Sequence, residues 1–256
     1  MRNGICQKLR AGETVYGIMA AEFFTPGFCQ IAANAGADFV IFDMEHGALG
    51  IDILKCQIAF ARGTGIAPLV RVPGIEYHLV APVLDAGATG IMAPMVETRQ
   101  QAENLAKWCR YRPEGARGVG FGVGHDDYRG GDIHASMREE NAKMLVIALV
   151  ETSTGIANAD AILSVPGVDV GWLGHYDLTN TLGITAEFDH PKFHTAVEAL
   201  TAACRTYGKA PGVLAGSVPQ ARDWRENWFR CLCFGTDVSV FQSALSNALQ
   251  ALRIEG

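Results

Sequence analysis

Short runs of apolar residues recur along the chain, and each is followed by polar residues, an amphipathic stretch and a return that contains glycine. Continuous apolar runs of this length predict strands that are buried on both faces, as in a parallel sheet. Strands are expected at 15–20, 38–42, 67–72, 90–95, 144–150, 168–173, 210–215 and 231–235. Helices are expected at 51–62, 76–86, 98–110, 154–163, 191–207 and 237–253.

This alternation of strands and helices predicts an α/β fold. Eight strand–helix units within 256 residues match a closed (β/α)8 barrel, or TIM barrel, better than an open doubly wound sheet, which is the alternative. No linker rich in Pro or Ser divides the chain. Residues 1–256 are therefore expected to form one barrel domain.

A glycine-rich stretch at 112–143 interrupts the alternation. Its glycines read G-V-G-F-G-V-G rather than G-x-G-x-x-G, and no strand-to-helix turn surrounds them, so a dinucleotide site is not supported. A long loop in a compact domain is more typical of a functional lid than of a linker. His125, Asp126 and Asp127 within it are expected to be solvated.

Composition excludes several classes of function. A net charge of −6 without a basic stripe argues against a nucleic-acid partner. No apolar stretch reaches the length of a membrane span, and "MRNGICQKLRAGE" lacks a signal-peptide core. Seven cysteines, scattered through apolar segments, predict reduced thiols in a cytoplasmic protein. The period-two spacing of Cys231 and Cys233 indicates core residues of a strand rather than metal ligands.

Ionisable residues gather where the expected strands end. Active sites of (β/α)8 barrels lie at the C-terminal ends of the strands, so these side chains are expected at one mouth of the barrel. They are Asp43, Glu45, His46, Arg71, Glu151, His175 and Asp177. Glu151 and Asp177 could instead be ordinary acids at helix N-termini. Arg71 is harder to explain that way, because a buried guanidinium needs an anionic partner.

The residue types at this mouth suggest a chemistry. Two carboxylates without a Cys or His cluster favour Mg²⁺ or Mn²⁺, which leaves coordination positions for water and a chelating 2-oxo acid. Such an ion polarises a carbonyl, while Arg71 could meet the enolate oxygen and His46 could move protons. A Schiff-base mechanism is not expected, because no lysine falls at the C-terminal end of a strand. The six are Lys8, Lys55, Lys107, Lys143, Lys192 and Lys209.

Several segments together resemble the HpcH/HpaI aldolase family, the metal-dependent (class II) pyruvate aldolases of the 2-keto-3-deoxy acid type. The resemblance covers nearly the whole chain. It lies in "FDMEHG", "VRVPG", "LDAGATGIMAPMVET", "RYRPEGARGVG" and "VETSTGIANADAILSVPGVDVGWLGHYDL". It implies reversible cleavage of a 4-hydroxy-2-oxo acid to pyruvate and an aldehyde, through a pyruvate enolate stabilised by Mg²⁺, Mn²⁺ or Co²⁺.

Carried over by position, the resemblance implies a role for each site residue. Glu151 and Asp177 would be the metal ligands, and His46 the acid/base, oriented by Asp85. Arg71 would stabilise the carbonyl and enolate oxygen. The pyruvate carboxylate would be held by the loop Gly174, His175 and Tyr176, through backbone groups near Gly174 and Tyr176.

Two positions depart from the family pattern. Leu149 stands where the family has Gln, and the family's G-P-x-D-L-S is Gly-His-Tyr-Asp-Leu-Thr at 174–179. Both changes bear on the substrate more than on the reaction class. Two alternatives remain: a citrate-lyase-like acyl-CoA lyase, and a non-catalytic 2-oxo-acid-binding protein.

The last helix is expected to carry an apolar stripe. The resemblance implies a homo-oligomer, a hexamer built as a trimer of dimers, in which this helix packs on a neighbour. Packing on its own barrel is the alternative. The stripe consists of Phe241, Leu245, Ala248 and Leu252.

Overall fold

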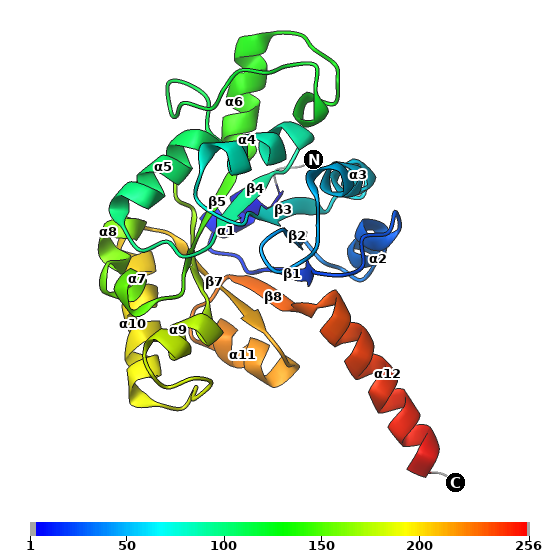
Figure 1. Cartoon of the computed structure of the whole chain (residues 1–256), viewed down its shortest axis with the longest axis vertical. Helices are drawn as coiled ribbons and strands as arrows, with labels where there is room; N and C mark the ends of the chain where they lie inside the picture. Colours follow the sequence, from blue (N-terminus) through cyan, green and yellow to red (C-terminus); the bar gives the residue numbers. More distant parts are fainter. Residues whose placement is uncertain (1–3, 255–256) are drawn as a thin grey trace.

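The computed structural model describes residues 4–254, which form a closed parallel barrel surrounded by helices (Figure 1). The strands follow the order of the chain, and β8 pairs with β1 to close the barrel. Their bounds are β1 Val15–Ala20, β2 Phe39–Asp43, β3 Ala67–Arg71, β4 Gly90–Ala93, β5 Leu145–Val150, β6 Val170–Leu173, β7 Ala210–Ala215 and β8 Cys231–Thr236. The predicted (β/α)8 barrel is confirmed, and the open sheet is excluded.

Helices lie outside the barrel and connect the strands. Their bounds are α1 Gly4–Arg10, α2 Phe28–Asn34, α3 Ile51–Ala61, α4 Tyr77–Ala86, α5 Arg99–Cys109, α6 Ile133–Lys143, α7 Ser153–Ala157, α8 Ala159–Leu163, α9 His175–Thr181, α10 Pro191–Thr206, α11 Val218–Glu226 and α12 Asp237–Ile254. The helix expected at 154–163 is in fact two, separated at Asn158. Five helices were not predicted: α1, α2, α6, α9 and α11.

Side chains that point into the barrel form a core of their own, separate from the core beneath the helices. Phe39, Ile41, Cys231 and Cys233 belong to it and are fully buried. The prediction that the two cysteines are core residues is therefore confirmed. Burial raises the pKa of the Cys233 thiol, which keeps it protonated and a poor metal ligand.

The segment expected to be one long loop at 112–143 is partly helical, and His125 is not solvated. Residues Ile133–Lys143 form α6, whose first turn is capped by the Asp132 carboxylate. Only 2 % of His125 is exposed, because its Nε2 bonds the Gly120 carbonyl at 2.6 Å and Glu140 of α6 lies beside its ring. Asp126 and Asp127 are half-buried. The predictions of one long loop and of a solvated His125 were wrong, because burial here comes from a contact between distant residues.

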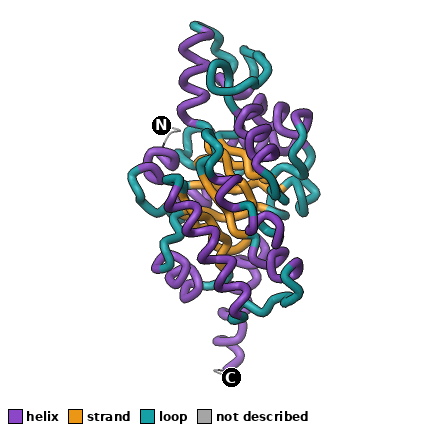
Figure 2. The backbone as a smooth tube through the Cα atoms, turned by 90° about the vertical axis from the view of Figure 1, so that its left-hand side faces the viewer, coloured by secondary structure: helices purple, strands orange, loops and turns teal. Residues whose placement is uncertain are grey.

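The segment that contains α6 extends from one end of the molecule and α12 from the other (Figures 1 and 2). The start of α12 is fixed, because the buried Asp237 carboxylate accepts hydrogen bonds from the backbone of residues 21–23. Beyond Val240 the helix is exposed through Arg253. Within residues 4–254, no helix combines the length and the apolar character needed to cross a membrane.

Close packing inside the barrel depends on glycine at position 17. A Cβ built on Gly17 would overlap the ring and the carbonyl oxygen of Phe39 on the neighbouring strand. Gly17→Ala should therefore lower the free energy of unfolding by about 1–3 kcal/mol, as overpacked cores do. Urea denaturation followed by tryptophan fluorescence measures the change. Gly27→Ala is the control, because the nearest atom to its Cβ is 3.8 Å away. Equal stability of the two variants would contradict this account.

Candidate active site

The C-terminal mouth, the end of the barrel at which the strands finish, opens into a cavity of about 320 Å³. It brings together every residue to which a role was assigned above, except Asp85. Its lining consists of Met19, His46, Arg71, Met92, Leu149, Glu151, Trp172, Leu173, Gly174, His175, Tyr176, Asp177, Leu214 and Thr236. Four of these lining residues also belong to the apolar core inside the barrel: Met19, Met92, Leu149 and Trp172.

Arg71 has the anionic partner that its burial requires. The parallel register of β2 and β3 sets Asp43 opposite Arg71. The guanidinium donates from Nε to Asp43 Oδ1 at 2.8 Å and from Nη2 to Oδ2 at 2.6 Å. Burial alone would raise the pKa of Asp43, but the hydrogen bonds and charge of Arg71 bring it below its usual value. The side chain of Arg71 is 13 % exposed, so this bidentate contact fixes a buried cation at the mouth.

Glu45 is a second partner of Arg71 and also faces His46. Its Oε2 lies 3.2 Å from Arg71 Nη1 and 3.8 Å from His46 Nε2. Burial raises the pKa of Glu45, an effect that Arg71 only partly offsets. The imidazole of His46 is two-thirds exposed and can reach a bound molecule. Asp43 and Glu45 were expected at the end of this strand but without a role. The need of a buried Arg71 for an anionic partner was the signal in the sequence that could have assigned one.

Glu151 is a buried carboxylate without a basic hydrogen-bond partner among the described residues. Its Oε1 accepts from the backbone N–H of Met95 at 2.8 Å. A Cβ on Gly174 would collide with Glu151 Cβ and Oε2, so glycine at 174 is needed for this position of the carboxylate. Burial, with the charges of Glu45 and Asp177, raises the pKa of Glu151 to about 7. Excess negative charge therefore surrounds Glu151.

The α9 segment supplies the other wall of the cavity. Asp177 lies in its first turn and is exposed. His175 is buried against Tyr176 and Phe188, with ring centroids 4.7 and 5.4 Å apart, and burial lowers its pKa to about 4. Tyr176 is 62 % exposed. His175 is thus a neutral packing group at neutral pH, and Tyr176 is free to contact a ligand.

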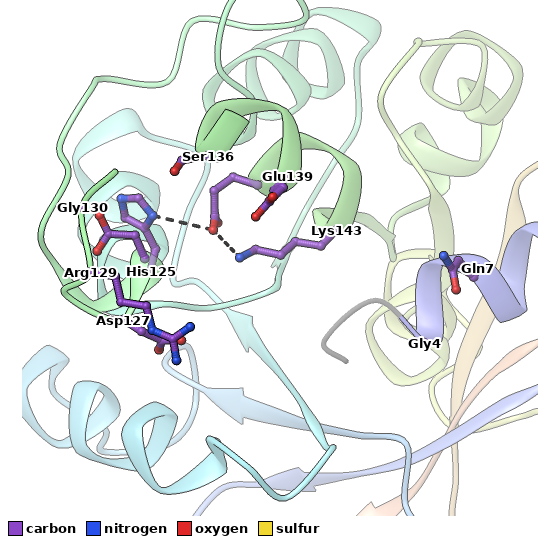
Figure 3. Close-up of a pocket in the computed structure, with 11 residues that line it drawn as sticks. Gly4, Gln7, His125, Asp127, Arg129, Gly130, Ser136, Glu139 and Lys143 are labelled. Atoms are coloured by element: carbon purple, nitrogen blue, oxygen red, sulfur yellow. Dashed lines mark hydrogen bonds and ion pairs between the residues drawn. The ribbon is translucent and has the colours of Figure 1, made fainter. Parts of the chain in front are cut away.

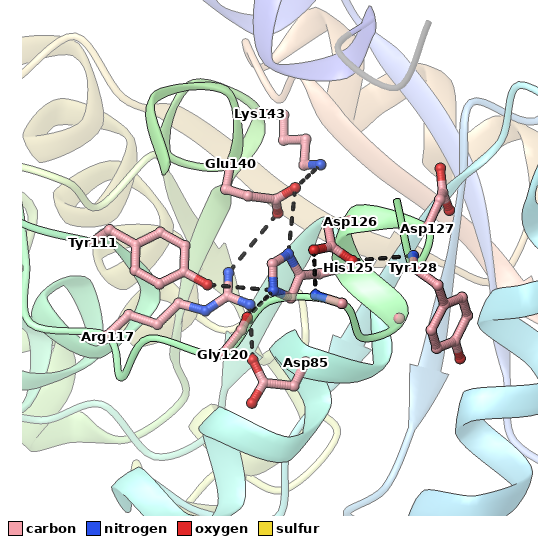
Figure 4. Close-up of polar contacts among 12 residues, drawn as sticks. Asp85, Tyr111, Arg117, Gly120, His125, Asp126, Asp127, Tyr128, Glu140 and Lys143 are labelled. Atoms are coloured by element: carbon pink, nitrogen blue, oxygen red, sulfur yellow. Dashed lines mark hydrogen bonds and ion pairs between the residues drawn. The ribbon is translucent and has the colours of Figure 1, made fainter. Parts of the chain in front are cut away.

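Asp85 does not reach His46 within one chain. It ends α4, which runs antiparallel to the strands, so it lies near the N-terminal end of the barrel while His46 follows a strand at the other end. The separation along the barrel is roughly the length of α4, about 15 Å at 1.5 Å per residue. Asp85 Oδ1 instead accepts a hydrogen bond from Arg117 Nη2 at 3.0 Å (Figure 4).

Comparisons with known proteins identify the family of the chain. Residues 21–244 match the sequence profile of the HpcH/HpaI aldolase/citrate lyase family. A hydroxypyruvate/pyruvate aldolase of Roseobacter denitrificans is 36 % identical over 83 % of this chain and 82 % of its own length. A 5-keto-4-deoxy-D-glucarate aldolase of Klebsiella pneumoniae is 31 % identical over 88 % of this chain and 87 % of its own.

A solved structure supports the same assignment. The HpcH/HpaI aldolase of Desulfitobacterium hafniense superposes with a TM-score of 0.91 at 29 % identity, over 96 % of this chain and 95 % of that one. Sequence and fold agree over nearly the whole length. The chain therefore belongs to the HpcH/HpaI aldolase/citrate lyase family.

Proposed function

We propose that this protein is a divalent-metal-dependent aldolase that reversibly cleaves a 4-hydroxy-2-oxo acid to pyruvate and an aldehyde. The observation that carries the proposal is the pair of carboxylates Glu151 and Asp177 in a cavity that also contains Arg71 and His46. The aldolase names of its relatives support the reaction class. A screen of 4-hydroxy-2-oxo acids with added metal, followed by detection of pyruvate, tests it.

The carboxylates fit a hard divalent ion, because Glu151 is buried next to other acids. Met95 binds only its Oε1, so Oε2 can accept an ion. Between residues 4 and 254, no group of three or more His, Cys, Asp or Glu residues forms a metal cluster. Glu151 and Asp177, which both line the cavity, would be the two protein ligands of Mg²⁺, Mn²⁺ or Co²⁺. Such an ion, when bound, supplies a Lewis acid for the substrate carbonyl.

Arg71 and His46 would carry the bond cleavage. Arg71 is oriented by Asp43 and would bind the C2 oxygen, where negative charge develops. His46 would take the proton of the C4 hydroxyl as the C3–C4 bond breaks, and then return a proton to C3. The backbone near Gly174 and Tyr176, with His175 packed behind, would hold the substrate carboxylate.

A homo-oligomer explains two features that a single chain leaves open. One is Asp85, which could orient His46 only if it came from a second copy. The other is α12, whose residues Phe241, Leu245, Leu249 and Leu252 are exposed.

A groove on the barrel matches this helix. Its volume is about 350 Å³, and it lies outside β1 and β8, where α12 would pack if it folded back. Its apolar lining includes Ile18, Phe28, Ile31 and Phe234. We infer that α12 of one copy covers the groove of another, in a hexamer built as a trimer of dimers.

The alternatives receive less support. An acyl-CoA substrate requires cations for its phosphates, yet among the residues that line the cavity Arg71 alone is a Lys or Arg, and two acids already bind it. A protein that only binds a 2-oxo acid would not need His46. All seven cysteines are free, which favours the reducing cytoplasm as its location.

Glu151 should make the stability of the metal-free protein depend on pH. Its pKa is about 7 in the folded chain and near 4.5 in the unfolded chain, so stability falls as the pH rises through this window. Above pH 7 the free energy of unfolding is lower by at most about 3 kcal/mol, because each pKa unit corresponds to about 1.36 kcal/mol. Glu151→Gln should therefore gain about 1–3 kcal/mol at pH 8 and little at pH 4.5, in urea denaturation with EDTA. The exposed Glu114→Gln is the control. No gain at pH 8 would contradict the raised pKa.

Chelation should abolish cleavage, and Mg²⁺, Mn²⁺ or Co²⁺ should restore it, because none of the six lysines within residues 4–254 is placed to form a Schiff base instead. Lys143 and Lys209 come just before β5 and β7, at the end of the barrel opposite the active site. Borohydride with pyruvate should leave the mass of the protein unchanged. Mass spectrometry and pyruvate release measure the two outcomes. A pyruvyl adduct on any lysine, or full activity in EDTA, would refute the metal mechanism.

Two inactive variants should complement each other. If His46 and Asp85 of different copies form each site, mixed oligomers of His46→Ala and Asp85→Asn chains regain about a quarter of the sites by random pairing. Coexpression with two affinity tags yields the mixed oligomer, and pyruvate release measures its activity. A mixture as inactive as its parents, or a monomer in light scattering, would exclude a shared site.

A further inference from the structure

Arg117 is a buried cation that lies against Asp85. The residue lies in the segment between α5 and α6, and its side chain is 1 % exposed. The guanidinium stacks over the ring of Tyr111, with Cζ 4.6 Å from the ring centroid, and donates from Nη2 to Asp85 Oδ1 at 3.0 Å (Figure 4). Packing over the ring limits the movement of the guanidinium, which donates its hydrogen bond to Asp85 from this position.

A second carboxylate holds Arg117 from behind. Glu140 of α6 is 5 % exposed, and its Oε2 lies 3.9 Å from Arg117 Nη1. The same carboxylate faces Lys143 and His125, whose Nδ1 is 3.8 Å away. Burial would raise the pKa of Glu140, but these cations bring it below its usual value, so it stays ionised.

This cluster connects three elements: α4 through Asp85, the part of the glycine-rich segment before α6 through Arg117 and His125, and α6 through Glu140. A cavity of about 750 Å³ on the other side of Glu140 lies between α6 and the residues Gly4 and Gln7 of α1 (Figure 3). Helix α6 does not pack tightly on α1 there. Its contact with the residues before it is made by the ion pairs of Glu140 and by Asn141, whose side chain exchanges two hydrogen bonds with the backbone of Tyr111.

Asp85 is held by one oxygen only. Arg117 binds Oδ1, whereas Oδ2 has no hydrogen-bond or ion-pair partner in the part of the chain from 4 to 254. The side chain of Asp85 is 43 % exposed, in contrast to the buried Arg117. A carboxylate anchored by one oxygen and open at the other can accept a hydrogen bond from an imidazole of another molecule.

We propose that Arg117 is a positioning residue for the aldolase reaction: it anchors Asp85 Oδ1 so that Oδ2 is presented to His46 of a second copy. This inference rests on the proposed function, and in particular on Asp85 orienting His46. Glu140 and Tyr111 hold Arg117 in turn. Arg117 does not touch the substrate, so its removal should slow proton transfer by His46 and leave substrate binding nearly unchanged.

Exchange of the methyl protons of pyruvate in D₂O tests the inference, because NMR follows the proton transfer without an aldehyde. The oligomer is assayed with Mg²⁺, which unlike Mn²⁺ is not paramagnetic and does not broaden the NMR signals. The parent protein is compared with Asp85→Asn, Arg117→Met, the double variant and Arg117→Lys. Arg117→Met should lower kcat by about 10- to 100-fold, as misplacement of a catalytic group does, and change KM less than about threefold. In the Asp85→Asn background the same substitution should cost nothing further, because both act through one carboxylate.

Arg62→Met is the matched control. Arg62 also binds the glycine-rich segment, through the Gly124 carbonyl at 2.7 Å, but makes no contact with Asp85. Arg62→Met should leave kcat within about threefold of the parent value. Its small effect on kcat should be the same in the Asp85→Asn background, because the two sites act independently. Arg117→Lys keeps the charge opposite Glu140 and should fold even if Arg117→Met does not; its kcat should lie between those of the parent and Asp85→Asn.

The outcomes separate the two proposals. If Asp85→Asn loses exchange while Arg117→Met and Arg117→Lys keep the kcat of the parent, only the inference about Arg117 is overturned. An equal further loss when Arg117→Met is added to Asp85→Asn would also overturn it, because Arg117 would then act only by stabilising the fold. Parental exchange in Asp85→Asn would overturn both roles, and absence of exchange in the parent protein would remove the proposed function itself.

Discussion

Arg71 donates to both carboxylate oxygens of Asp43, at 2.8 and 2.6 Å, and the rest of the mouth is built around this contact. The pairing register of β2 and β3 creates it, so the barrel itself orients the guanidinium. Removing Arg71 would leave the buried carboxylate of Asp43 without its counter-ion, at a cost of about 3–5 kcal/mol. The register of β2 with β3 and the orientation of the ligand-facing cation are therefore one structural requirement.

Around this single cation the mouth collects an excess of acids. Arg71 is already shared by Asp43 and Glu45, and Glu151 and Asp177 stand nearby. Burial raises the pKa of both Glu45 and Glu151, an effect that the positive charge of Arg71 only partly offsets. The fold thus keeps carboxylates in a position that is unfavourable without a counter-ion. Such local instability is a usual feature of sites that bind metals and polarise substrates.

The sequence predicts the barrel well because apolar runs buried on both faces have a strong signature, and because Arg71 in such a run demands a partner. It fails where structure depends on contacts between distant residues. Nothing near His125 indicates that Glu140 will bury it, and the polar helix α6 has too few apolar positions to stand out. Asp85 illustrates a different limit. The fold places it far from His46 within one chain, so a contact between the two side chains would require a second copy, which the pattern of one sequence does not reveal.

The direction of α12 has a consequence for how the molecule matures. A single chain closes its eight strands, but the groove beside β1 and β8 and the apolar face of α12 stay in contact with water. In the proposed oligomer another copy covers them, so the last step of maturation would be bimolecular. Its rate would then depend on how often copies meet, and until then the open groove would expose the chain to misassociation.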